Sequence, residues 1–292
     1  MSDTYSQLIL GTAQLGLPYG HGDRRDDLML ESEAYRILDI ASDGGINTID
    51  TSPEYGCAES RIAKYLHENS DKGFHVISKI KNIMNSGTSI NDTVNNWFYK
   101  NPFSLLDNCL SLSVLLHTEC DLNNLEIQET LEKAKQGGQI TRWGVSLYSD
   151  KTAFNTLAIS GCEIVQVPYG VLNQQLDVSG VLGKIWAKNK FVHARSIFNR
   201  GLFFSSMDKL ADYGEETVEL ICQLRAFLAE NNLSAVKFAL QFVLEQSFIT
   251  SVIAGFDSSD QIEDFVLASQ DSQPLDVPNE LLAQARNLQF SY

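Results

Sequence analysis

The stretch "GINTIDTSPEYGCAES", residues 45–60, contains a predicted strand and the polar residues that follow it. A short apolar run ends at a carboxylate, Asp50, as expected of a buried strand that emerges from a core. Pro53 then interrupts regular structure, and Tyr55 lies five residues beyond the aspartate. The stretch therefore predicts a core strand with an acid and a phenol just past its end.

Similar apolar runs recur along the chain and alternate with amphipathic stretches. Together they predict eight strands, at residues 8–12, 46–50, 74–79, 113–117, 142–146, 163–167, 191–196 and 251–255. Residues 31–45 repeat apolar side chains every three or four positions and end in two glycines, which is typical of a helix. Residues 124–138 follow the same pattern. Residues 215–232 and 234–246 predict a helical pair, with Ser234 as the N-cap of the second helix.

This alternation of strands and helices predicts a parallel sheet built from βα units. Eight strands close a (β/α)8 TIM barrel, and such a barrel needs roughly 250 residues. An open, doubly wound sheet is the alternative, but it usually carries GxGxxG after its first strand, and "GTAQLG" (11–16) does not match that motif. No linker or shift of composition divides the chain. We therefore expect one α/β barrel as a single domain over residues 1–292.

The composition argues against several classes of partner. The net charge is −15 with only 22 Lys and Arg residues, which disfavours binding to nucleic acid. The N-terminal stretch lacks the basic and apolar regions of a secretory signal, and no apolar run reaches the ~20 residues of a membrane span. Five cysteines without a CxxC pair fit a reducing compartment and indicate no metal site. We expect a cytoplasmic protein that binds neither nucleic acid nor membrane.

Polar residues lie at the ends of three consecutive predicted strands. Asp50, Lys79 and His117 end the second, third and fourth strands, and Tyr55 follows in the loop after Asp50. In a barrel these ends meet at one mouth, where active sites lie. A free tyrosine has a pKa of about 10, and an adjacent lysine ammonium would lower it. Asp50 would keep the lysine charged, and His117 would donate a hydrogen bond to a carbonyl oxygen.

Each of these residues alone would also fit an ordinary structural role. Asp50 fits a turn, Tyr55 a half-buried aromatic side chain, Lys79 a strand that emerges into solvent, and His117 a core histidine. Their joint placement at consecutive strand ends favours a shared function, because the set suits chemistry in which a carbonyl oxygen gains or loses a proton.

These residues resemble those of the aldo-keto reductase superfamily, and the resemblance covers nearly the whole chain. The stretch from "GINTIDTSPEYG" to "AKYL" resembles the family segment in which a strand-end Asp precedes Tyr-Gly and a Glu-containing helix. "VISKI" and "VLLHTE" resemble the strands that carry the catalytic lysine and histidine. "LEKAKQGGQITRWGVS" and "EIVQVPYGVLNQ" match the stretches that lead to the fifth strand and through the sixth.

The resemblance implies a barrel that binds NADP(H) or NAD(H) in an extended pose, without a metal. Tyr55 would then be the general acid of carbonyl reduction, tuned by Lys79 and Asp50, with His117 orienting the carbonyl and hydride coming from the cofactor. The residues implied to bind the cofactor are Gly11, Thr12, Ser146, Gln166, Arg195, Gly201, Gly255, Phe256 and Gln261. Of these, Ser146 and Gln166 match positions that hold the nicotinamide carboxamide, and Arg195 falls where many members stack an aromatic side chain.

Several positions depart from the family pattern. Leu147 replaces an Asn that many members have after Ser146, so one carboxamide contact is expected to be missing. The adenine-end segment "AGFDSSDQIEDF" (254–265) holds carboxylates where NADPH-preferring members place Lys and Arg, which disfavours a 2′-phosphate. The family's usual choice of NADPH points the other way. Phe256 could stack on the adenine or pack against the barrel, and Phe265 stands where a polar residue is common.

The substrate implied is a small-molecule carbonyl compound, sugar-like by a weak likeness of residues 8–20 to bacterial members. Tyr19 and Trp97 are candidate walls of its pocket, although Trp97 also fits a helix core. Two alternatives remain open at this point: a regulatory subunit whose bound cofactor acts as a sensor, and a non-redox barrel enzyme using the same acid–base set. The oligomeric state cannot be read from the sequence, though many relatives are monomers.

Overall fold

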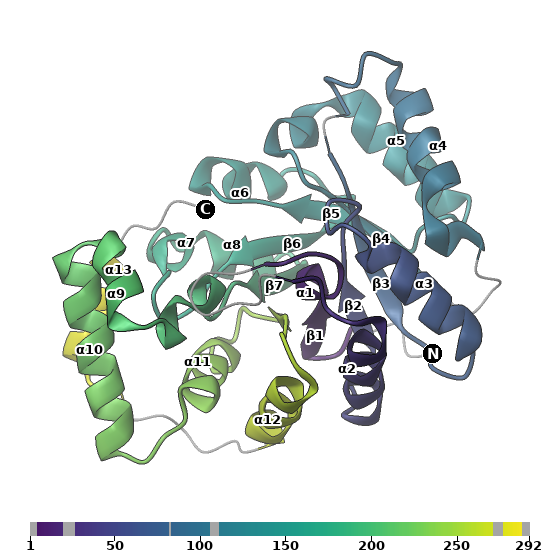
Figure 1. Ribbon diagram of the computed structural model, residues 1–292. Coiled ribbons are helices and arrows are strands. Elements are labelled where there is room, and N and C mark those ends of the chain that lie inside the picture. The colour runs from purple at the N-terminus through teal and green to yellow at the C-terminus, as the bar shows by residue number, and fades with distance from the viewer. Residues whose placement is uncertain (1–4, 20–26, 82, 106–110, 271–276, 288–292) are drawn as a thin grey trace.

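The protein folds as a closed barrel of eight parallel strands (Figure 1). The computed structural model describes residues 5–19, 27–81, 83–105, 111–270 and 277–287. The strands pair in chain order, and the barrel closes where β8 pairs with β1. Their bounds are β1 Leu8–Gly11, β2 Thr48–Asp50, β3 His75–Ile80, β4 Ser111–Leu116, β5 Arg142–Ser146, β6 Cys162–Pro168, β7 Phe191–Arg195 and β8 Ser251–Ala254. The predicted (β/α)8 barrel is confirmed.

Helices surround the strands (Figure 1). The α-helices are α1 Ala13–Gly16, α2 Glu31–Asp43, α3 Ala58–Glu68, α4 Ile90–Lys100, α5 Leu125–Gln136, α6 Asp150–Thr156, α7 Gln175–Val178, α8 Val181–Trp186, α9 Met207–Leu210, α10 Glu215–Glu230, α11 Ala235–Leu244, α12 Ser259–Gln270 and α13 Asn279–Asn287. Short 3-10 helices are η1 Pro102–Leu105, η2 Glu119–Asn123, η3 Asn199–Phe204 and η4 Ala211–Tyr213. The four helices expected from the sequence are present, and the Ser234 side chain caps α11 by accepting a hydrogen bond from the Lys237 amide.

The strands are short and almost wholly buried because side chains on both faces are covered. In β3 all six residues are buried: Val76 and Ile80 pack outward towards the helices, and Ile77 packs inside the barrel. Apolar residues thus lie on both faces of the strand, as is typical of parallel sheets, and His75, Ser78 and Lys79 are its buried polar residues. The small interior cluster is Tyr5, Ile9, Ile77, Leu115, Ile164 and Ile253. This apolar filling closes the barrel axis and leaves polar groups to gather at the C-terminal ends of the strands.

Some boundaries differ from those expected. β4 begins two residues earlier than predicted and ends at Leu116, so His117 is the first residue after the strand. β3 extends one residue past Lys79, to Ile80. These shifts are of the size by which strand ends usually vary, and they leave both side chains at the same mouth. We expected a single domain over residues 1–292. Because both chain ends lie outside the described residues, its outer bounds stay a prediction.

The loop that carries Tyr55 is fixed by a close approach of two glycines. Gly56 has a φ of +57°, and a Cβ there would overlap the carbonyl oxygen of Gly16. A Cβ on Gly16 would in turn overlap the carbonyl oxygen of Tyr55. The Cys57 amide donates a hydrogen bond to the Gly16 oxygen at 3.2 Å. α1 and the Tyr55 loop therefore touch backbone to backbone, which only glycine permits.

Within the described residues, no helix combines the length and the apolar character that a membrane span requires.

Candidate active site

The structure brings Asp50, Lys79 and Tyr55 together at the C-terminal mouth of the barrel. Nζ of Lys79 donates to Oδ1 of Asp50 at 2.6 Å and to the Thr51 carbonyl oxygen at 2.8 Å, and it lies 3.4 Å from the Tyr55 hydroxyl. The side chains of Lys79 and Asp50 are only 2% and 5% exposed. A buried ion pair with a phenol at its open side is the arrangement that the strand ends predicted.

Burial decides the protonation state of Tyr55. Burial raises the pKa of Tyr55 above its usual value, and the nearby Lys79 ammonium only partly opposes this. Lys79 lowers the pKa of Tyr55 as expected, but desolvation of the phenolate outweighs this attraction, so the pKa lies above its usual value. Burial would lower the pKa of Lys79, but Asp50 and Tyr55 outweigh it and raise that pKa. At neutral pH the site holds a neutral phenol beside an ammonium.

His117 is neutral as well. Burial, and after it the Lys79 ammonium, lowers the pKa of His117 to about 4. Its Nδ1 lies 3.2 Å from Oε2 of Glu54, and the other oxygen of Glu54 pairs with Lys81. Glu54 was not among the residues selected from the sequence. Its position directly before Tyr55 was the available signal, because that loop has to approach the strand ends.

Ser146 and Gln166 form a chain of hydrogen bonds that ends at Asp50. The Ser146 hydroxyl donates to Oε1 of Gln166 at 3.1 Å, and Nε2 of Gln166 donates to Oδ2 of Asp50 at 2.7 Å. Both side chains are 1% exposed. Lys79 and Gln166 thus hold one Asp50 oxygen each, which fixes the carboxylate plane. The role implied for Ser146 and Gln166 at a nicotinamide carboxamide stays a prediction.

A first cavity, called the β8 cavity, extends from Tyr55 along the ends of β1, β7 and β8. Its volume is about 450 Å³, within the range of small-molecule sites. Of the implied cofactor residues it is lined by Gly11, Thr12, Arg195, Gly201, Gly255, Phe256 and Gln261, together with Tyr19, Asp50 and Tyr55. A Cβ on Gly255 would meet the amide end of the Gln14 side chain, which also lines this cavity.

The two ends of the β8 cavity differ in charge. At the strand end, the Arg195 guanidinium stacks 4.3 Å from the Tyr148 ring centroid and donates to the Leu147 carbonyl oxygen. At the far end the charged lining residues are Asp257 and Asp264, and Arg195 is the only cationic side chain among the described residues that line the cavity. The cavity therefore suits an elongated ligand that carries no extra phosphate at the acidic end.

Two aromatic residues of the acidic end pack into the protein. Phe256 is 4% exposed and lies against Phe265, with ring centroids 5.1 Å apart. Phe265 is fully buried and also meets Phe198. Phe256 thus forms part of the cavity wall. Of the two roles considered for it, the structure favours packing against the barrel over stacking on an adenine ring. Leu147 is fully buried too, so this position cannot offer a polar group to a ligand.

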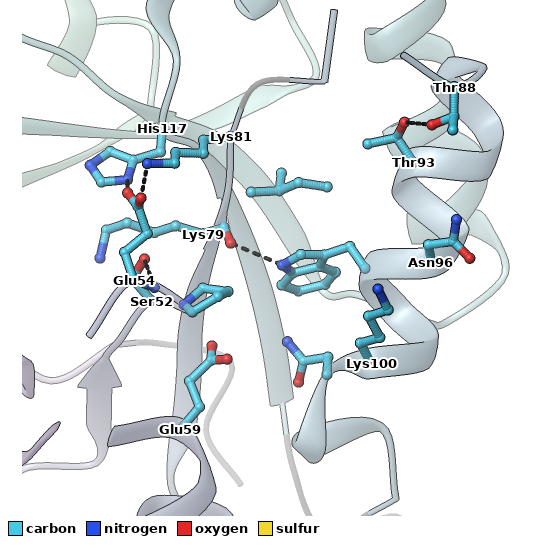
Figure 2. A pocket seen from close by; sticks show the side chains of 14 residues that line it. Ser52, Glu54, Glu59, Lys79, Lys81, Thr88, Thr93, Asn96, Lys100 and His117 are labelled. Atoms are coloured by element: carbon cyan, nitrogen blue, oxygen red, sulfur yellow. Dashed lines mark hydrogen bonds and ion pairs between the residues drawn. The ribbon is translucent and has the colours of Figure 1, made fainter. Parts of the chain in front are cut away.

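A second cavity, called the α4 cavity, opens between the Tyr55 loop and α4 (Figure 2). Its volume is about 400 Å³. Most of its lining residues are of polar types, although the exposed surface of the cavity is mainly apolar. They are Ser52, Glu54, Glu59, Lys79, Lys81, Thr88, Thr93, Asn96, Lys100, Asn101 and His117, with Pro53, Ile80 and Trp97. Trp97 is held in the wall by a hydrogen bond from Nε1 to the Lys79 carbonyl oxygen, at 2.9 Å. Tyr19 and Trp97 therefore line two different cavities, Tyr19 the β8 cavity and Trp97 the α4 cavity.

No cluster of three or more side chains suited to hold a metal ion occurs in the described part of the chain.

The chain matches the model of the aldo/keto reductase family over residues 7–276 and belongs to that family. Two solved structures from Pseudomonas aeruginosa, both described as candidate aldo-keto reductases, share the fold with TM-scores of 0.66 and 0.65. Each is 21% identical to this chain and aligns over 91% of this chain and 90% of the other. No curated protein sequence matches the chain significantly. Membership in the family supports an NAD(P)H-dependent oxidoreductase that reduces carbonyl groups.

Proposed function

We propose that this protein reduces the carbonyl group of a small polar aldehyde or ketone to an alcohol, with Tyr55 as the proton donor. The observation that carries the proposal is the buried Lys79 ammonium, which lies between the Asp50 carboxylate and the Tyr55 hydroxyl. The family implies a nicotinamide dinucleotide, which would supply the hydride for the carbonyl carbon when bound. The acidic surface and the cysteine pattern favour action in the cytoplasm on a small molecule, with no nucleic acid or membrane partner.

The residues of the site then have distinct tasks. Tyr55 carries its proton at neutral pH because burial raises its pKa, so it can donate to an oxygen on which negative charge develops. The phenolate left behind is stabilised by Lys79, whose own charge is maintained by Asp50. Gln166 holds the second oxygen of Asp50 and prevents that carboxylate from turning away. The pre-aligned ammonium needs little reorganisation when charge appears on Tyr55.

We place the dinucleotide in the β8 cavity, and the substrate carbonyl at the end of the same cavity where Tyr55 lies. The β8 cavity is lined by Tyr55 and by strand-end glycines that allow a flat ring to approach the backbone. The α4 cavity is lined by Lys79 and His117 but not by Tyr55, so a substrate held wholly within it would not reach the proton donor. Asp257 and Asp264 favour NAD(H) over NADP(H), since a 2′-phosphate would meet like charge there.

The experiment that tests the assignment is Tyr55→Phe, assayed with a panel of small aldehydes and ketones. Loss of the proton donor is expected to reduce kcat by at least about a hundredfold. Binding of NADH, followed by cofactor fluorescence, is expected to change little, because the phenyl ring keeps the wall of the cavity. Full turnover by the variant would remove Tyr55 from the role of proton donor. Failure of the wild type to bind either cofactor would remove the reductase proposal itself.

A further inference from the structure

Arg195 ends β7 at the mouth of the barrel and lines the β8 cavity together with Tyr55. Its guanidinium lies 4.3 Å from the ring centroid of Tyr148. It also donates long hydrogen bonds to the Leu147 carbonyl oxygen, at 3.5 Å, and to the Ser196 hydroxyl, at 3.4 Å. A planar cation held against an aromatic ring and two oxygen atoms has a fixed place in the wall of the cavity.

The charge of Arg195 reaches the end of the cavity where the reaction is proposed. It is one of the cations that lower the pKa of His117, which lies at the same mouth. Two other charges of this end, on Lys79 and Asp50, form an ion pair, so their fields largely cancel. Of the described side chains that line the β8 cavity, Arg195 alone is cationic. Arg195 therefore gives this end of the cavity a positive field.

The proposed reaction requires the nicotinamide ring at the same end. Tyr55 gives its proton to the carbonyl oxygen, and the carbonyl carbon one bond away has to lie about 3–3.5 Å from the hydride donor. Hydride transfer removes one proton and two electrons from the reduced ring. The products are a neutral alcohol, a ring with one positive charge and a Tyr55 phenolate, so charge and atoms balance. The ring is therefore neutral before the reaction and cationic after it.

The reduced and oxidised dinucleotides carry the same adenosine diphosphate and differ in charge only at this ring. Asp257 and Asp264 at the far end of the cavity act on both forms alike, whereas a cation at the ring distinguishes them. We propose that Arg195 selects the reduced cofactor, because its guanidinium repels the positive ring of the oxidised form. The protein then retains the hydride donor and releases the spent cofactor readily. The inference rests on the function proposed above and adapts that site to reduction rather than oxidation.

The partial exposure of Arg195 limits the size of this effect. Arg195 is neither fully buried nor fully exposed, so solvent screens its charge. Even with the screening of bulk water, two unit charges about 4 Å apart change an equilibrium by about fivefold. We take this factor as the expected contribution of Arg195 to the ratio of the two dissociation constants, Kd for NAD⁺ divided by Kd for NADH.

The first experiment measures both dissociation constants by isothermal titration calorimetry. Arg195→Met keeps the length and the apolar stem of the side chain but removes its charge, so the ratio should fall by about fivefold through tighter binding of NAD⁺. Arg195→Lys keeps a positive charge and should keep most of the ratio. Lys81→Met is the matched control: Lys81 is a cation of the mouth that pairs with Glu54 and does not line the β8 cavity, so its loss should leave the ratio unchanged. If the wild type binds NADPH instead, NADPH and NADP⁺ give the same ratio.

Three results would overturn the proposal. Equal weakening of both forms in Arg195→Met would assign the guanidinium to the diphosphate, which the two forms share. A ratio that stays at the wild-type value in Arg195→Met would show that the charge does not reach the ring. A ratio that falls as far in Arg195→Lys as in Arg195→Met would show that the charge is not the cause. A circular dichroism melt checks that each variant is folded.

The second experiment uses NAD⁺ as a product inhibitor of carbonyl reduction. Its inhibition constant should fall by about fivefold in Arg195→Met and stay unchanged in Lys81→Met. If no carbonyl compound is reduced but the Kd ratio shifts as expected, the proposed function fails and the selection by Arg195 stands. If carbonyl compounds are reduced and the ratio does not shift, the selection by Arg195 fails and the proposed function stands. Binding of no nicotinamide dinucleotide by the wild type would reject both.

Discussion

The two halves of the barrel treat buried polar side chains differently. At the C-terminal mouth, the buried Lys79 ammonium lies between a carboxylate and a phenol. In the N-terminal half, the buried ring of His193 has no hydrogen-bond partner on either nitrogen among the described residues. His193 is fully buried, and its ring meets the edge of Tyr5 with centroids 5.2 Å apart. Burial lowers the pKa of His193 to about 3, so it stays neutral. The Lys79 charge is thus buried against an opposite charge, whereas the buried ring of His193 is kept neutral.

This contrast shows what the chemistry requires of the fold. An unpaired buried charge is costly, and the cheaper solution is to keep the group neutral, as His193 does. At the mouth a charge is retained because Asp50 compensates it, and the proposed reduction of a carbonyl uses that ammonium beside the phenol. This comparison can be tested with variants that remove the partner of the buried Lys79 charge, or that replace the buried ring of His193.

The largest effect is expected from Asp50→Asn, which leaves the Lys79 ammonium buried without its carboxylate. Removing one partner of a buried pair typically lowers the free energy of unfolding by about 3–5 kcal/mol. The pKa of Lys79 should fall for the same reason, and activity should fall with it because the phenolate of Tyr55 loses its counter-charge. Urea unfolding at pH 7 measures the stability, and kcat measures the activity.

The control is Glu31→Gln, which breaks the exposed ion pair between Glu31 and Lys64. Both of these side chains are about half exposed, so solvent replaces the lost contact and the unfolding midpoint should not move. If the unfolding midpoint of Asp50→Asn also stays unchanged, Asp50 does not stabilise the buried charge on Lys79.

A smaller effect is expected from His193→Leu, and it depends on pH. The pKa of His193 is about 3 in the folded protein and about 6.5 in the unfolded chain. Between these values the unfolded state binds a proton that the folded state does not, so stability is full above about pH 6.5 and is lost as the pH falls towards 3. The loss from this group is about 1.4 kcal/mol per pH unit in the middle of that range.

His193→Leu removes this contribution, so the free energy of unfolding should fall less between pH 7 and pH 4 than it does in the wild type. His67→Gln is the matched control, because His67 is exposed and should leave the wild-type slope unchanged. If the slope for His193→Leu equals that of the wild type, the buried ring is not the source of acid sensitivity and carboxylates or other histidines must account for it.

The residues of the mouth could be predicted from the sequence because they follow strands that are adjacent in the chain. Parallel strands joined by helices align their C-terminal ends, so Asp50, Lys79 and His117 had to converge once the barrel was recognised. The barrel itself was predictable for the same reason: its pairing order is the chain order.

Contacts across the barrel could not be predicted in the same way. Gln166 on β6 reaches Asp50 on β2 through the barrel interior, and nothing in local spacing indicates that pair. The raised pKa of Tyr55 depends on how closely the loop is packed, which a sequence does not show. The Glu54–His117 contact depends on side-chain conformation, and the separate cavities of Tyr19 and Trp97 depend on where α4 lies.

The smallest effect is expected at the acidic end of the β8 cavity, where charges are exposed to solvent. Asp264→Asn should tighten NADPH binding relative to NADH by about two- to fivefold, because an exposed charge pair contributes at most about 1 kcal/mol. Asp260→Asn on the same helix is the matched control, since Asp260 is exposed and does not line the cavity. Dissociation constants come from fluorescence titration of each cofactor.

Salt gives this prediction a second, independent criterion. The repulsion between Asp264 and a 2′-phosphate acts through solvent and is screened, with a Debye length of about 10 Å at 0.1 M salt. The wild-type preference for NADH should therefore shrink as salt is raised, and Asp264→Asn should show a weaker salt dependence than Asp260→Asn. If the wild type prefers NADPH and both variants behave alike, cations outside the described lining reach the 2′-phosphate. Among the described residues, the charge argument would then hold for the Lys79–Asp50 pair of the mouth and not for the cofactor's adenine end.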